Sequence, residues 1–435
     1  MSGKRTLYER LCDDYDIINE AWELVSKKPN KDSEGIDEIK LSEFAFNQRK
    51  YLSQIRKELR ANNYKFDKVR GALLTKDNGK PRPIQIATIK DRVVQKALEL
   101  LIRKPLDKKH NIFNNPASFA FVKKSEIDEI DAETGVWGAI EQVKEYYDNG
   151  YTWAVKSDIQ NFFPSIDRTK LFKDYVYPCL NGDSSLNDLL EKSFTVETAQ
   201  IEELEKSLSK RFGSKYKIKD LFPDNIELGV YQGSILSPLM SNVYLADFDK
   251  TLLEEGYNLV RYADDFIILC KTKDDAINAF KRCRELLKAK GLKLHDHSFS
   301  VSEKKKTVIA ELKHIDFLGL EIVGSKVYPS KASINKYVIK LEEIAASKAS
   351  LMRKLNRIEK LVNAWGSTYR RTDHYKDLYK NLDGALKLTV NSSFIKAGLT
   401  PKYKMNNRSL RKYGIHFFDN RVVYYRNRWL NSQKS

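Results

Sequence analysis

The chain has 435 residues, 41% of them hydrophobic and 31% charged, which is the composition of a globular protein with two or three domains. No stretch reaches the roughly 18 consecutive apolar residues of a membrane-spanning helix, and residues 1–14 contain no apolar signal segment. We therefore expect a cytoplasmic protein that binds no membrane. The four cysteines are scattered and lack C-x-x-C spacing, which argues against a disulfide framework and against a zinc site.

The net charge of +18 is concentrated near the C-terminal end of the sequence. Residues 331–435 contain 23 Lys and Arg against 7 Asp and Glu, a net charge of +16, which leaves +2 for residues 1–330. Basic residues interleaved with aromatic residues are typical of a surface that holds a polyanion through phosphate contacts and base stacking. The alternative is a solvated charged surface, although such surfaces usually mix both signs.

The first half of the sequence predicts helices followed by a basic hairpin. Residues 1–62 are polar, with apolar positions at helical spacing. Short apolar runs on either side of a turn at 77–79 predict a hairpin that contains Lys76, Lys80 and Arg82. The other expected elements are strands over 71–74, 83–86 and 152–159, a helix over 89–103 and a polar helical insertion over 184–210.

The second half combines helices with a further hairpin and predicts an α+β fold with an antiparallel sheet. Pro238 favours a helix start, because its fixed φ suits the first turn of a helix. Helices are expected over 240–253 and 274–289, on either side of a hairpin around 262–265. A long helix is predicted over 333–365 by apolar residues that share one face: Leu351, Leu355, Ile358 and Val362.

Two adjacent carboxylates, Asp264 and Asp265, lie at the tip of the second hairpin. Holding two such charges together costs roughly a few kcal/mol unless a cation or a proton lies between them. Asp158 ends another apolar strand, and it joins the pair if that strand lies beside the hairpin. Three carboxylates suit two Mg²⁺ ions, which prefer oxygen ligands and can stabilise an in-line phosphoryl displacement. The chemistry indicated is nucleotidyl transfer, and the alternative is a solvated Asp-Asp turn.

Around these carboxylates the sequence resembles the palm of reverse transcriptases, particularly the bacterial lineage related to group II intron enzymes. The resemblance covers roughly residues 64–323. It implies a right-hand polymerase with an N-terminal helical extension (1–62), fingers (63–150), a palm (151–330) and a basic helical thumb and C-terminal region (331–435). Its seven segments, in chain order, are 80–84 (KPRPI), 90–95 (KDRVVQ), 118–121 (SFAF), 158–163 (DIQNFF), 232–238 (QGSILSP), 262–265 (YADD) and 317–320 (FLGL).

The resemblance implies that Asp158 and Asp264 are the principal metal ligands, with the main-chain carbonyl of Ile159 as a further oxygen ligand. Asp265 is similar to the third, supporting acid of the family. The implied cofactor is a pair of Mg²⁺ ions, for which Mn²⁺ is a possible substitute. One lysine of 304–306 (KKK) would lie near the leaving pyrophosphate, unless the three form a solvated edge.

The resemblance also assigns residues to the nucleotide. Lys76 and Arg82 are similar to the residues that grip the triphosphate, and Gln232 and Gly233 to the segment against the incoming nucleotide and the template. An aromatic ring at Phe163 would leave no room for a 2′-hydroxyl, so dNTPs are the expected substrates. Residues assigned to the primer or the template are Phe317, Leu318, Gly319 and Arg92, although Arg92 is equally expected to be a structural salt-bridge partner of Asp91 or another nearby acid.

We therefore expect an RNA-directed DNA polymerase that copies an RNA template into DNA. No segment resembles a Cys/His endonuclease domain, an RNase H domain or the segment found in retron enzymes. These absences favour the stand-alone relatives that act in anti-phage defence with a structured non-coding RNA. The basic region is expected to bind that RNA through its backbone and through stacking of exposed bases. Candidate basic residues are Arg370 and Arg371. Candidate aromatic residues, each equally expected to lie in the core, are Trp365, Tyr369, Tyr379, Tyr403, Tyr424, Tyr425 and Trp429.

Other functions remain open from the sequence. A splicing maturase is one alternative, because residues 364–369 resemble the thumb of such proteins. An RNA-dependent RNA polymerase is disfavoured by Phe163. Protein-primed or untemplated DNA synthesis would use a tyrosine hydroxyl in place of the primer 3′-OH, and Tyr424 and Tyr425 keep it open. The sequence does not indicate the oligomeric state.

Overall fold

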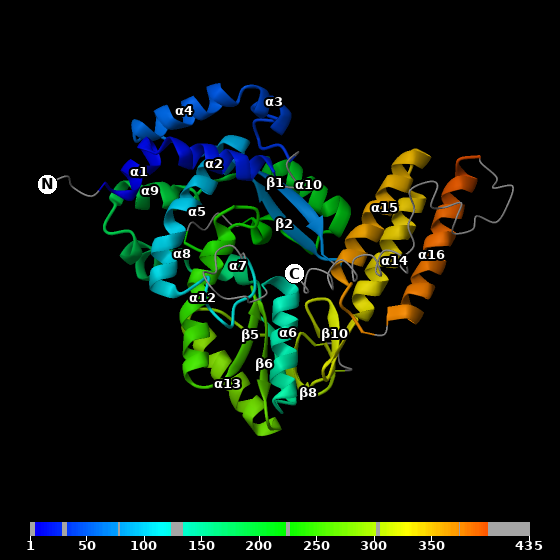
Figure 1. Ribbon diagram of the computed structural model, residues 1–435. Helices are drawn as coiled ribbons and strands as arrows, with labels where there is room; N and C mark the ends of the chain where they lie inside the picture. Colours follow the sequence, from blue (N-terminus) through cyan, green and yellow to red (C-terminus); the bar gives the residue numbers. More distant parts are fainter. Residues whose placement is uncertain are drawn as a thin grey trace, which may run out of the picture.

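The fold is centred on a five-stranded sheet. It is seen in a computed structural model that describes residues 5–27, 33–76, 79–122, 134–222, 227–301, 305–373 and 375–398, without the side chains of 375–381 (Figure 1). The strands are β3 (Trp153–Asp158), β5 (Asn258–Tyr262), β6 (Asp265–Cys270), β7 (His297–Ser298) and β8 (Thr307–Glu311). Their order is β5-β6-β3-β8-β7, with β7 and β8 parallel and the other neighbours antiparallel. The predicted α+β fold with an antiparallel sheet is confirmed.

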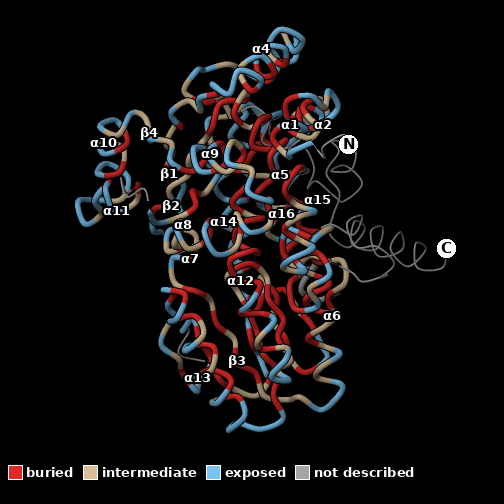
Figure 2. The backbone as a smooth tube through the Cα atoms, turned by 90° about the vertical axis from the view of Figure 1, so that its left-hand side faces the viewer, coloured by how far each residue is buried: buried red, intermediate tan, exposed pale blue. Residues whose placement is uncertain are grey.

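Both faces of this sheet are buried at β6, because this strand is apolar at every position after Asp265. Phe266 and Ile268 of β6 contribute to one core cluster, and Ile267 and Leu269 to the other. Figures 1 and 2 show helices on both sides of the buried strands. The first cluster includes residues of α12 (Ser237–Glu254) and α13 (Lys273–Ala289), and the second includes residues of α6 (Gly135–Asp148).

A second sheet is built on the predicted basic hairpin. Strands β1 (Val69–Thr75) and β2 (Pro81–Ile86) pair antiparallel, as predicted. A third strand, β4 (Thr198–Ala199), pairs with β1 in parallel. Gly71 of β1 permits a close approach to this region, because a Cβ atom there would lie 2.3 Å from a methyl carbon of Leu204. The insertion thus extends the hairpin sheet by one strand.

The insertion predicted to be helical over 184–210 contains two helices with β4 between them. The helical prediction is wrong for the middle of the segment, where the β-branched residues Thr195, Val196 and Thr198 favour extended backbone. Gln200, with φ of 59°, then turns the chain into the second helix. Elements of this region are α7 (Phe162–Ser165), α8 (Arg168–Lys170), a π-helical turn (Leu171–Val176), a 3₁₀ turn (Tyr177–Cys179), α9 (Ser184–Lys192), α10 (Ile201–Phe212) and α11 (Ile218–Leu221).

The N-terminal extension is helical, as predicted, and packs against the long helix α5 (Ile89–His110). Ile18 and Trp22 share a core cluster with Val94 and Leu98 of α5. None of the helices within the described ranges combines the length and the apolar character needed to cross a membrane. The helices of the extension are α1 (Leu7–Asp13), α2 (Tyr15–Ser26), α3 (Leu41–Phe46) and α4 (Gln48–Arg60).

The long helix predicted over 333–365 is divided into two. Its first part ends at Ser347, whose backbone is extended, and the second part begins after Ser350. Serine competes with helical hydrogen bonding and favours helix ends, which explains a break in the segment 347–350 (SKAS). The C-terminal elements are β9 (Lys313–Phe317), β10 (Leu320–Val323), β11 (Lys326–Pro329), α14 (Lys331–Ala346), α15 (Leu351–Thr368) and α16 (Tyr375–Lys396).

The face predicted for α15 is the one that packs against the rest of the protein. Leu355, Ile358 and Val362 are buried in the cluster that also contains Val260 and Ile267 of the central sheet. Figure 1 shows α14, α15 and α16 as a bundle beside β10. The basic region is therefore joined to the sheet through a shared core, at least as far as residue 396.

We expect Ile358→Ala to lower the free energy of unfolding by about 2–5 kcal/mol, because it leaves a cavity in this shared core. The matched control is Met352→Ala on the same helix, where the side chain is 65% exposed, and its effect should be within about 0.5 kcal/mol. Urea unfolding of both variants measures the difference. Equal effects would mean that α15 does not stabilise the fold through this face.

Candidate active site

The three predicted carboxylates lie at the same end of neighbouring strands. Tyr262 and Asp265 are register partners in the β5–β6 hairpin, so Ala263 and Asp264 form a two-residue turn. Asp158 is the register partner of Asp265 across β3 and β6, and the N–H of Ile159 donates to the carbonyl of Asp264 at 3.0 Å. Strand pairing thus brings the predicted acids together.

Burial and mutual repulsion raise the pKa values of the two carboxyl groups at the hairpin, Asp264 and Asp265. Burial raises the pKa of Asp265 to about 6, and the ammonium group of Lys156 opposes this shift. Burial also raises the pKa of Asp264, and the charge of Asp158 raises it further. The repulsion between neighbouring carboxylates that the sequence predicts is therefore present in the fold.

Three cationic or polar nitrogen atoms lie against the carboxylates. Lys156 Nζ is 3.0 Å from Asp265 Oδ1, and His295 Nε2 is 3.2 Å from Asp158 Oδ1. Lys306 forms an ion pair with Asp158 Oδ2. Burial lowers the pKa of His295, although the charge of Asp158 opposes this shift. Two lysines therefore supply most of the positive charge that balances the carboxylates.

The carboxylate oxygens suit a divalent cation chemically. Asp158 Oδ1 and Asp265 Oδ1 are buried and accept no hydrogen bond of good geometry from any residue that the structure describes. Such oxygens are the hard ligands that Mg²⁺ prefers. Within the described ranges, however, no three His, Cys, Asp or Glu side chains converge closely enough to hold a metal ion by themselves. A cation at Asp158 would compete with the ammonium group of Lys306.

Within the lysine run 304–306, Lys306 is the residue in contact with the acids. Lys304 lies outside the described residues, and Lys305 is exposed. The ion pair with Asp158 places the Lys306 ammonium group at the carboxylate cluster. The Lys306 side chain is 55% exposed, so this ion pair lies at the solvent edge of the carboxylate cluster.

The basic hairpin faces the same cluster. Burial lowers the pKa of Lys76, and the positive charges of Arg82 and Lys306 lower it further. The carboxylate of Asp264 acts in the opposite direction. Lys76 therefore lies within electrostatic range of Asp264, and Arg82 lies within range of Lys76. This juxtaposition of cations and carboxylates is what a nucleoside triphosphate with its metal ions would need.

The segment that contains Gln232 and Gly233 is held by main-chain hydrogen bonds. The N–H of Gln85 on β2 donates to the carbonyl of Gln232 at 2.9 Å, and the N–H of Val230 donates to the carbonyl of Phe163 at 2.9 Å. Gly233 has φ of 127°, and a Cβ atom there would lie 2.0 Å from the carbonyl oxygen of Gln85. Only glycine fits this approach. The predicted nucleotide-binding residues therefore form one connected unit.

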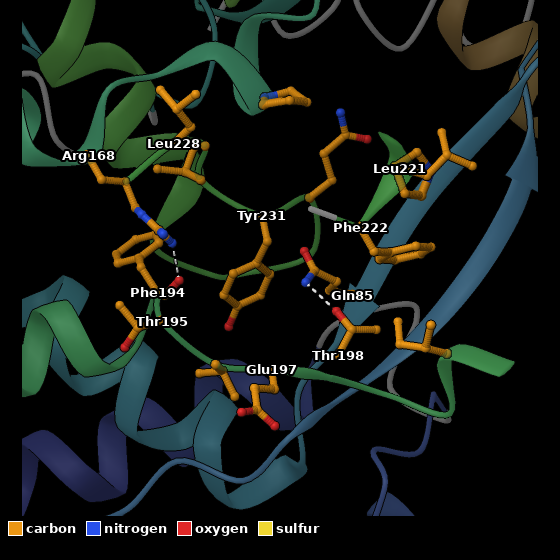
Figure 3. Close-up of a pocket in the computed structure, with 17 residues that line it drawn as sticks. Gln85, Arg168, Phe194, Thr195, Glu197, Thr198, Leu221, Phe222, Leu228 and Tyr231 are labelled. Atoms are coloured by element: carbon orange, nitrogen blue, oxygen red, sulfur yellow. Dashed lines mark hydrogen bonds between the residues drawn. The ribbon is translucent and has the colours of Figure 1, made fainter. Parts of the chain in front are cut away.

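A pocket of 490 Å³ lies behind this unit (Figure 3). Its lining includes Gln232 and Pro164, the residue that follows Phe163. Figure 3 shows Tyr231 projecting among the lining residues and the hydrogen bond of 2.8 Å that Gln85 Nε2 donates to Thr198 Oγ1. The residue that follows Phe163 thus borders a partly open pocket.

The turn predicted to support the primer joins β9 to β10. Leu318 and Gly319 have φ of 53° and 80°, the left-handed region that two-residue hairpin turns require. The carbonyl of Gly319 accepts hydrogen bonds from Ser330 N–H at 3.1 Å and from Ser333 Oγ at 2.8 Å. Phe317 is buried. The turn is thus fixed to the start of α14.

The hydrogen bonds of Arg92 go to main-chain carbonyls, and its predicted contact with primer or template stays a prediction. Its guanidinium donates to the main-chain carbonyls of Ala87, at 2.9 Å, and of Ser33. Its neighbour Asp91 instead accepts a hydrogen bond from Tyr64 Oη at 2.7 Å. Arg92 therefore ties the residues before α3 to the start of α5, and it forms no salt bridge with Asp91.

The prediction that Trp365 and Tyr369 stack on RNA bases is wrong, because both rings are buried. They pack on each other with ring centroids 4.2 Å apart, inside the cluster shared with the central sheet. Arg370 Nη1 donates to the carbonyl of Ser367 at 2.6 Å, and the guanidinium of Arg371 lies 5.6 Å from the ring centroid of Trp137. The side chains of Tyr379, Tyr403, Tyr424, Tyr425 and Trp429 lie outside the described residues.

Sequence reasoning missed Arg261, which is almost fully buried beside the turn that carries Asp264. Its guanidinium forms a two-pronged ion pair with Asp249 of α12, at 2.7 and 2.5 Å. Nη1 also donates to Asn242 Oδ1 and to the carbonyl of Ala263, each at 3.1 Å, and Nη2 donates to Ser118 Oγ at 3.0 Å. The one available signal was a charged residue inside an apolar strand.

The Ala263 contact gives Arg261 a positioning role. Ala263 has φ of 58°, a conformation that costs a non-glycine residue about 1 kcal/mol or more. A buried donor on its carbonyl helps to hold that conformation and therefore the direction of Asp264. Arg261 thus links the acid-bearing turn to α12 and to residue 118.

The comparisons with known proteins agree with this geometry. Residues 74–322, more than half of the chain, match the family described as reverse transcriptase (RNA-dependent DNA polymerase). The chain belongs to this family. The predicted right-hand polymerase fold, with a sheet-based palm and a helical C-terminal module, is therefore confirmed.

Individual relatives are distant. The chain is 24% identical over 245 residues to "Putative COX1/OXI3 intron 2 protein" of Saccharomyces cerevisiae, covering 56% of the chain and 24% of that protein. It is 26% identical over 276 residues to "Protein YkfC" of Escherichia coli, covering 54% of the chain and 63% of that protein. The match thus spans about a quarter of the yeast protein and less than two thirds of the bacterial one.

The chain also matches solved structures, including the following two. One is titled "Partial Cas6-RT-Cas1--Cas2 complex", with 25% identity, 71% of this chain and 44% of that chain covered, and a TM-score of 0.35. The other is an apo telomerase from Candida tropicalis, with 14% identity, 83% and 62% covered, and a TM-score of 0.40. The family assignment rests on the sequence match.

We expect Arg261→Met to lower the free energy of unfolding by about 3–5 kcal/mol, because it leaves Asp249 as an unpaired buried charge. The double variant Arg261→Met with Asp249→Asn removes both charges and should recover part of that stability. Its kcat for nucleotide incorporation should still fall at least about tenfold, since the Ala263 carbonyl has lost its donor. Urea unfolding and primer extension test this pair. A double variant with wild-type kcat would show that Arg261 contributes to stability alone.

Proposed function

We propose that this protein is a Mg²⁺-dependent RNA-directed DNA polymerase that adds dNTPs to a primer on an RNA template. The observation that supports this most directly is the meeting of Asp158, Asp264 and Asp265 at one end of paired strands, with the cations of the basic hairpin facing them. Membership of the reverse transcriptase family supports the same activity. The product is a DNA strand complementary to the RNA.

Each residue of the cluster has a separate part in this proposal. Asp158 and Asp264, with the carbonyl of Ile159, offer oxygen ligands for two Mg²⁺ ions, and Mn²⁺ can substitute. The bound ions would stabilise the charge that develops on the attacking and leaving oxygens. Asp265 supports the site from its contact with Lys156. Asp264 is therefore the carboxylate of the turn that we expect to be indispensable.

The cations orient the triphosphate and the leaving group. Lys76 and Arg82 bind phosphate oxygens, and the planar guanidinium of Arg82 can engage two of them at once. Lys306 would exchange its contact with Asp158 for the leaving pyrophosphate when metal ions neutralise the acid. It can then donate a proton from Nζ to a pyrophosphate oxygen. In this exchange the metal ions would replace Lys306 as the positive charge beside Asp158, and Lys306 would neutralise part of the charge of the pyrophosphate.

Phe163 selects the sugar in this proposal. It is half-buried and lies against Phe162, with ring centroids 5.5 Å apart. Its carbonyl is held by Val230, in the unit that also contains Gln232. A ring fixed in this way leaves no space for a 2′-hydroxyl group. This constraint supports dNTPs over rNTPs and disfavours RNA synthesis.

The proposed RNA is a structured non-coding RNA, and the proposed setting is anti-phage defence in the cytoplasm. Support comes from the excess positive charge of residues 331–435. The described part of that region is anchored on the sheet, so its charge has a fixed position relative to the active site. Protein-primed synthesis at Tyr424 or Tyr425 would involve residues outside the described structure.

A splicing maturase is the second candidate function. The observation that favours it is the likeness to two yeast proteins that are named as intron proteins. In that function the protein would bind intron RNA, and the carboxylate cluster would be dispensable. The two candidates therefore differ in whether Asp264 is needed.

We expect Asp264→Asn to abolish Mg²⁺-dependent dNTP incorporation, with a loss of at least about 10³-fold, because it removes a proposed metal ligand and its charge. RNA binding, measured by filter retention, should be unchanged. The matched control is Asp274→Asn, which removes an exposed carboxylate on α13. Undiminished incorporation by Asp264→Asn would refute the site assignment, and retained splicing activity would then favour the maturase.

We expect Phe163→Val to raise the efficiency of rNTP incorporation relative to dNTP incorporation by about tenfold or more, since the smaller side chain admits a 2′-hydroxyl. The measurement is kcat/KM for dTTP and UTP on the same primer and template. Phe162→Leu, at the buried neighbouring ring, is the control for general loosening. An unchanged ratio for Phe163→Val would show that another group excludes the hydroxyl.

A further inference from the structure

A basic track runs along the N-terminal helices, on the part of the chain whose net charge is almost neutral. It consists of two grooves. The first, of 1230 Å³, lies between α1, the end of α5 and residues 178–183. The second, of 960 Å³, lies between α2 and α4. Tyr15 lines both grooves, so they meet at its ring.

Most cations of the track have no acidic partner among the described residues, Arg60 being an exception. Lys104 and Lys108 are one turn apart on α5, and they share the first groove with Arg10 of α1. Among the residues that the structure describes, none forms an ion pair with seven of the basic side chains that line the track: Arg5, Arg10, Arg49, Lys57, Lys104, Lys108 and Lys109.

The acids of the first groove are engaged elsewhere. Asp183 accepts hydrogen bonds from the N–H groups of Tyr8, at 2.7 Å, and Leu186, at 3.1 Å. Asp14 accepts from Asp16 N–H at 3.1 Å, as the cap of α2, and Asp13 faces Arg60 at 3.7 Å. The carboxylates thus fix the helix ends, and the positive charge of the groove is left for a ligand.

Tyr15 offers one face of its ring at the junction. The guanidinium of Arg56 lies 4.0 Å from the ring centroid, and it is held there by hydrogen bonds to the carbonyl of Tyr15 and to Asn19 Oδ1. The side chain remains 64% exposed. An aromatic ring that is supported on one face and open on the other is a stacking platform for a nucleobase.

We propose that this track binds an unpaired segment of RNA, with phosphates on the cations and a base stacked on Tyr15. Two joined grooves exceed the size of a single small-molecule site, which favours a polymeric ligand over a mononucleotide. An aromatic platform between two cationic grooves suits a strand whose bases are free to stack, whereas duplex RNA hides its base faces. This inference deepens the proposed function, because it assigns a surface to the RNA partner apart from the carboxylate cluster.

The phosphate contacts are tested by charge reversal in the full-length protein. Lys104→Glu with Lys108→Glu should weaken the binding of single-stranded oligo(A) RNA, and the slope of log affinity against log salt should fall by about 1.4, at roughly 0.7 per lost contact. The matched control is Lys281→Glu with Lys288→Glu, which makes the same charge change on exposed residues of α13. Equal losses in both double variants would overturn the track as the binding surface.

The stacking contact is tested at Tyr15. Tyr15→Ala should weaken oligo(A) binding by roughly 5- to 100-fold with an unchanged salt slope, and Tyr15→Phe should retain affinity because it keeps the ring. Binding of a blunt RNA duplex should not respond to Tyr15→Ala. Equal losses for duplex and single strand, or a loss in Tyr15→Phe as large as in Tyr15→Ala, would overturn the stacking assignment. Thermal unfolding confirms that each variant is folded.

The binding assays need no nucleotide incorporation, so they separate this inference from the polymerase assignment. Asp264→Asn should bind oligo(A) RNA as the wild type does while failing to extend a primer. The track variants should extend a primer on poly(rA)/oligo(dT) with wild-type kcat at saturating template. A wild-type protein that binds oligo(A) through Tyr15 and incorporates no dNTP would overturn the polymerase assignment alone.

Discussion

The register between β3 and β6 is the constraint on which the active site depends. It places Asp158 opposite Asp265 and lets the N–H of Ile159 reach the carbonyl of Asp264. If β3 shifted by one residue relative to β6, Asp158 would point to the other face of the sheet. The same shift in β6 would turn Phe266 and Ile268 away from the core cluster in which they are buried. Because both faces of β6 are buried, the two hydrophobic clusters fix this register from opposite sides. The packing of the two hydrophobic clusters therefore also determines the positions of the three acids.

The electrostatics of the site follow from that packing. Strands that bury both faces also desolvate the acids at their ends, which raises the pKa values of Asp264 and Asp265. Lys156 and Lys306 offset the resulting cost from neighbouring strands. The same lysines would have to share the carboxylates with incoming metal ions. The two lysines therefore neutralise part of the negative charge that the strand pairing brings together.

Local patterns in the sequence were sufficient for β3, for the two hairpins and for the hairpin tip that carries Asp264 and Asp265, because alternation and turn chemistry act over a few residues. The meeting of Asp158 with these acids was predicted only on the condition that β3 pairs with the hairpin, which the structure shows. Local patterns failed where the outcome depends on distant partners. Trp365 and Tyr369 lie in a basic segment but are buried against the sheet. Arg261 is positioned by Asp249, 12 residues away, and by Ser118, 143 residues away, and no periodicity reports such contacts. The break before α15 was missed because the apolar face continues across it.

The distribution of charge shows the same limit. Counting charges along the sequence pointed to residues 331–435 as the RNA-binding region, since most of the excess lies there. In the fold, what decides whether a cation can bind phosphate is whether a carboxylate already neutralises it. Along α1 and α5 the acids serve helix caps, so a segment of nearly zero net charge presents unpaired cations. The net charge of a segment therefore differs from the number of its cations that no carboxylate neutralises. That number can be read only from the folded chain.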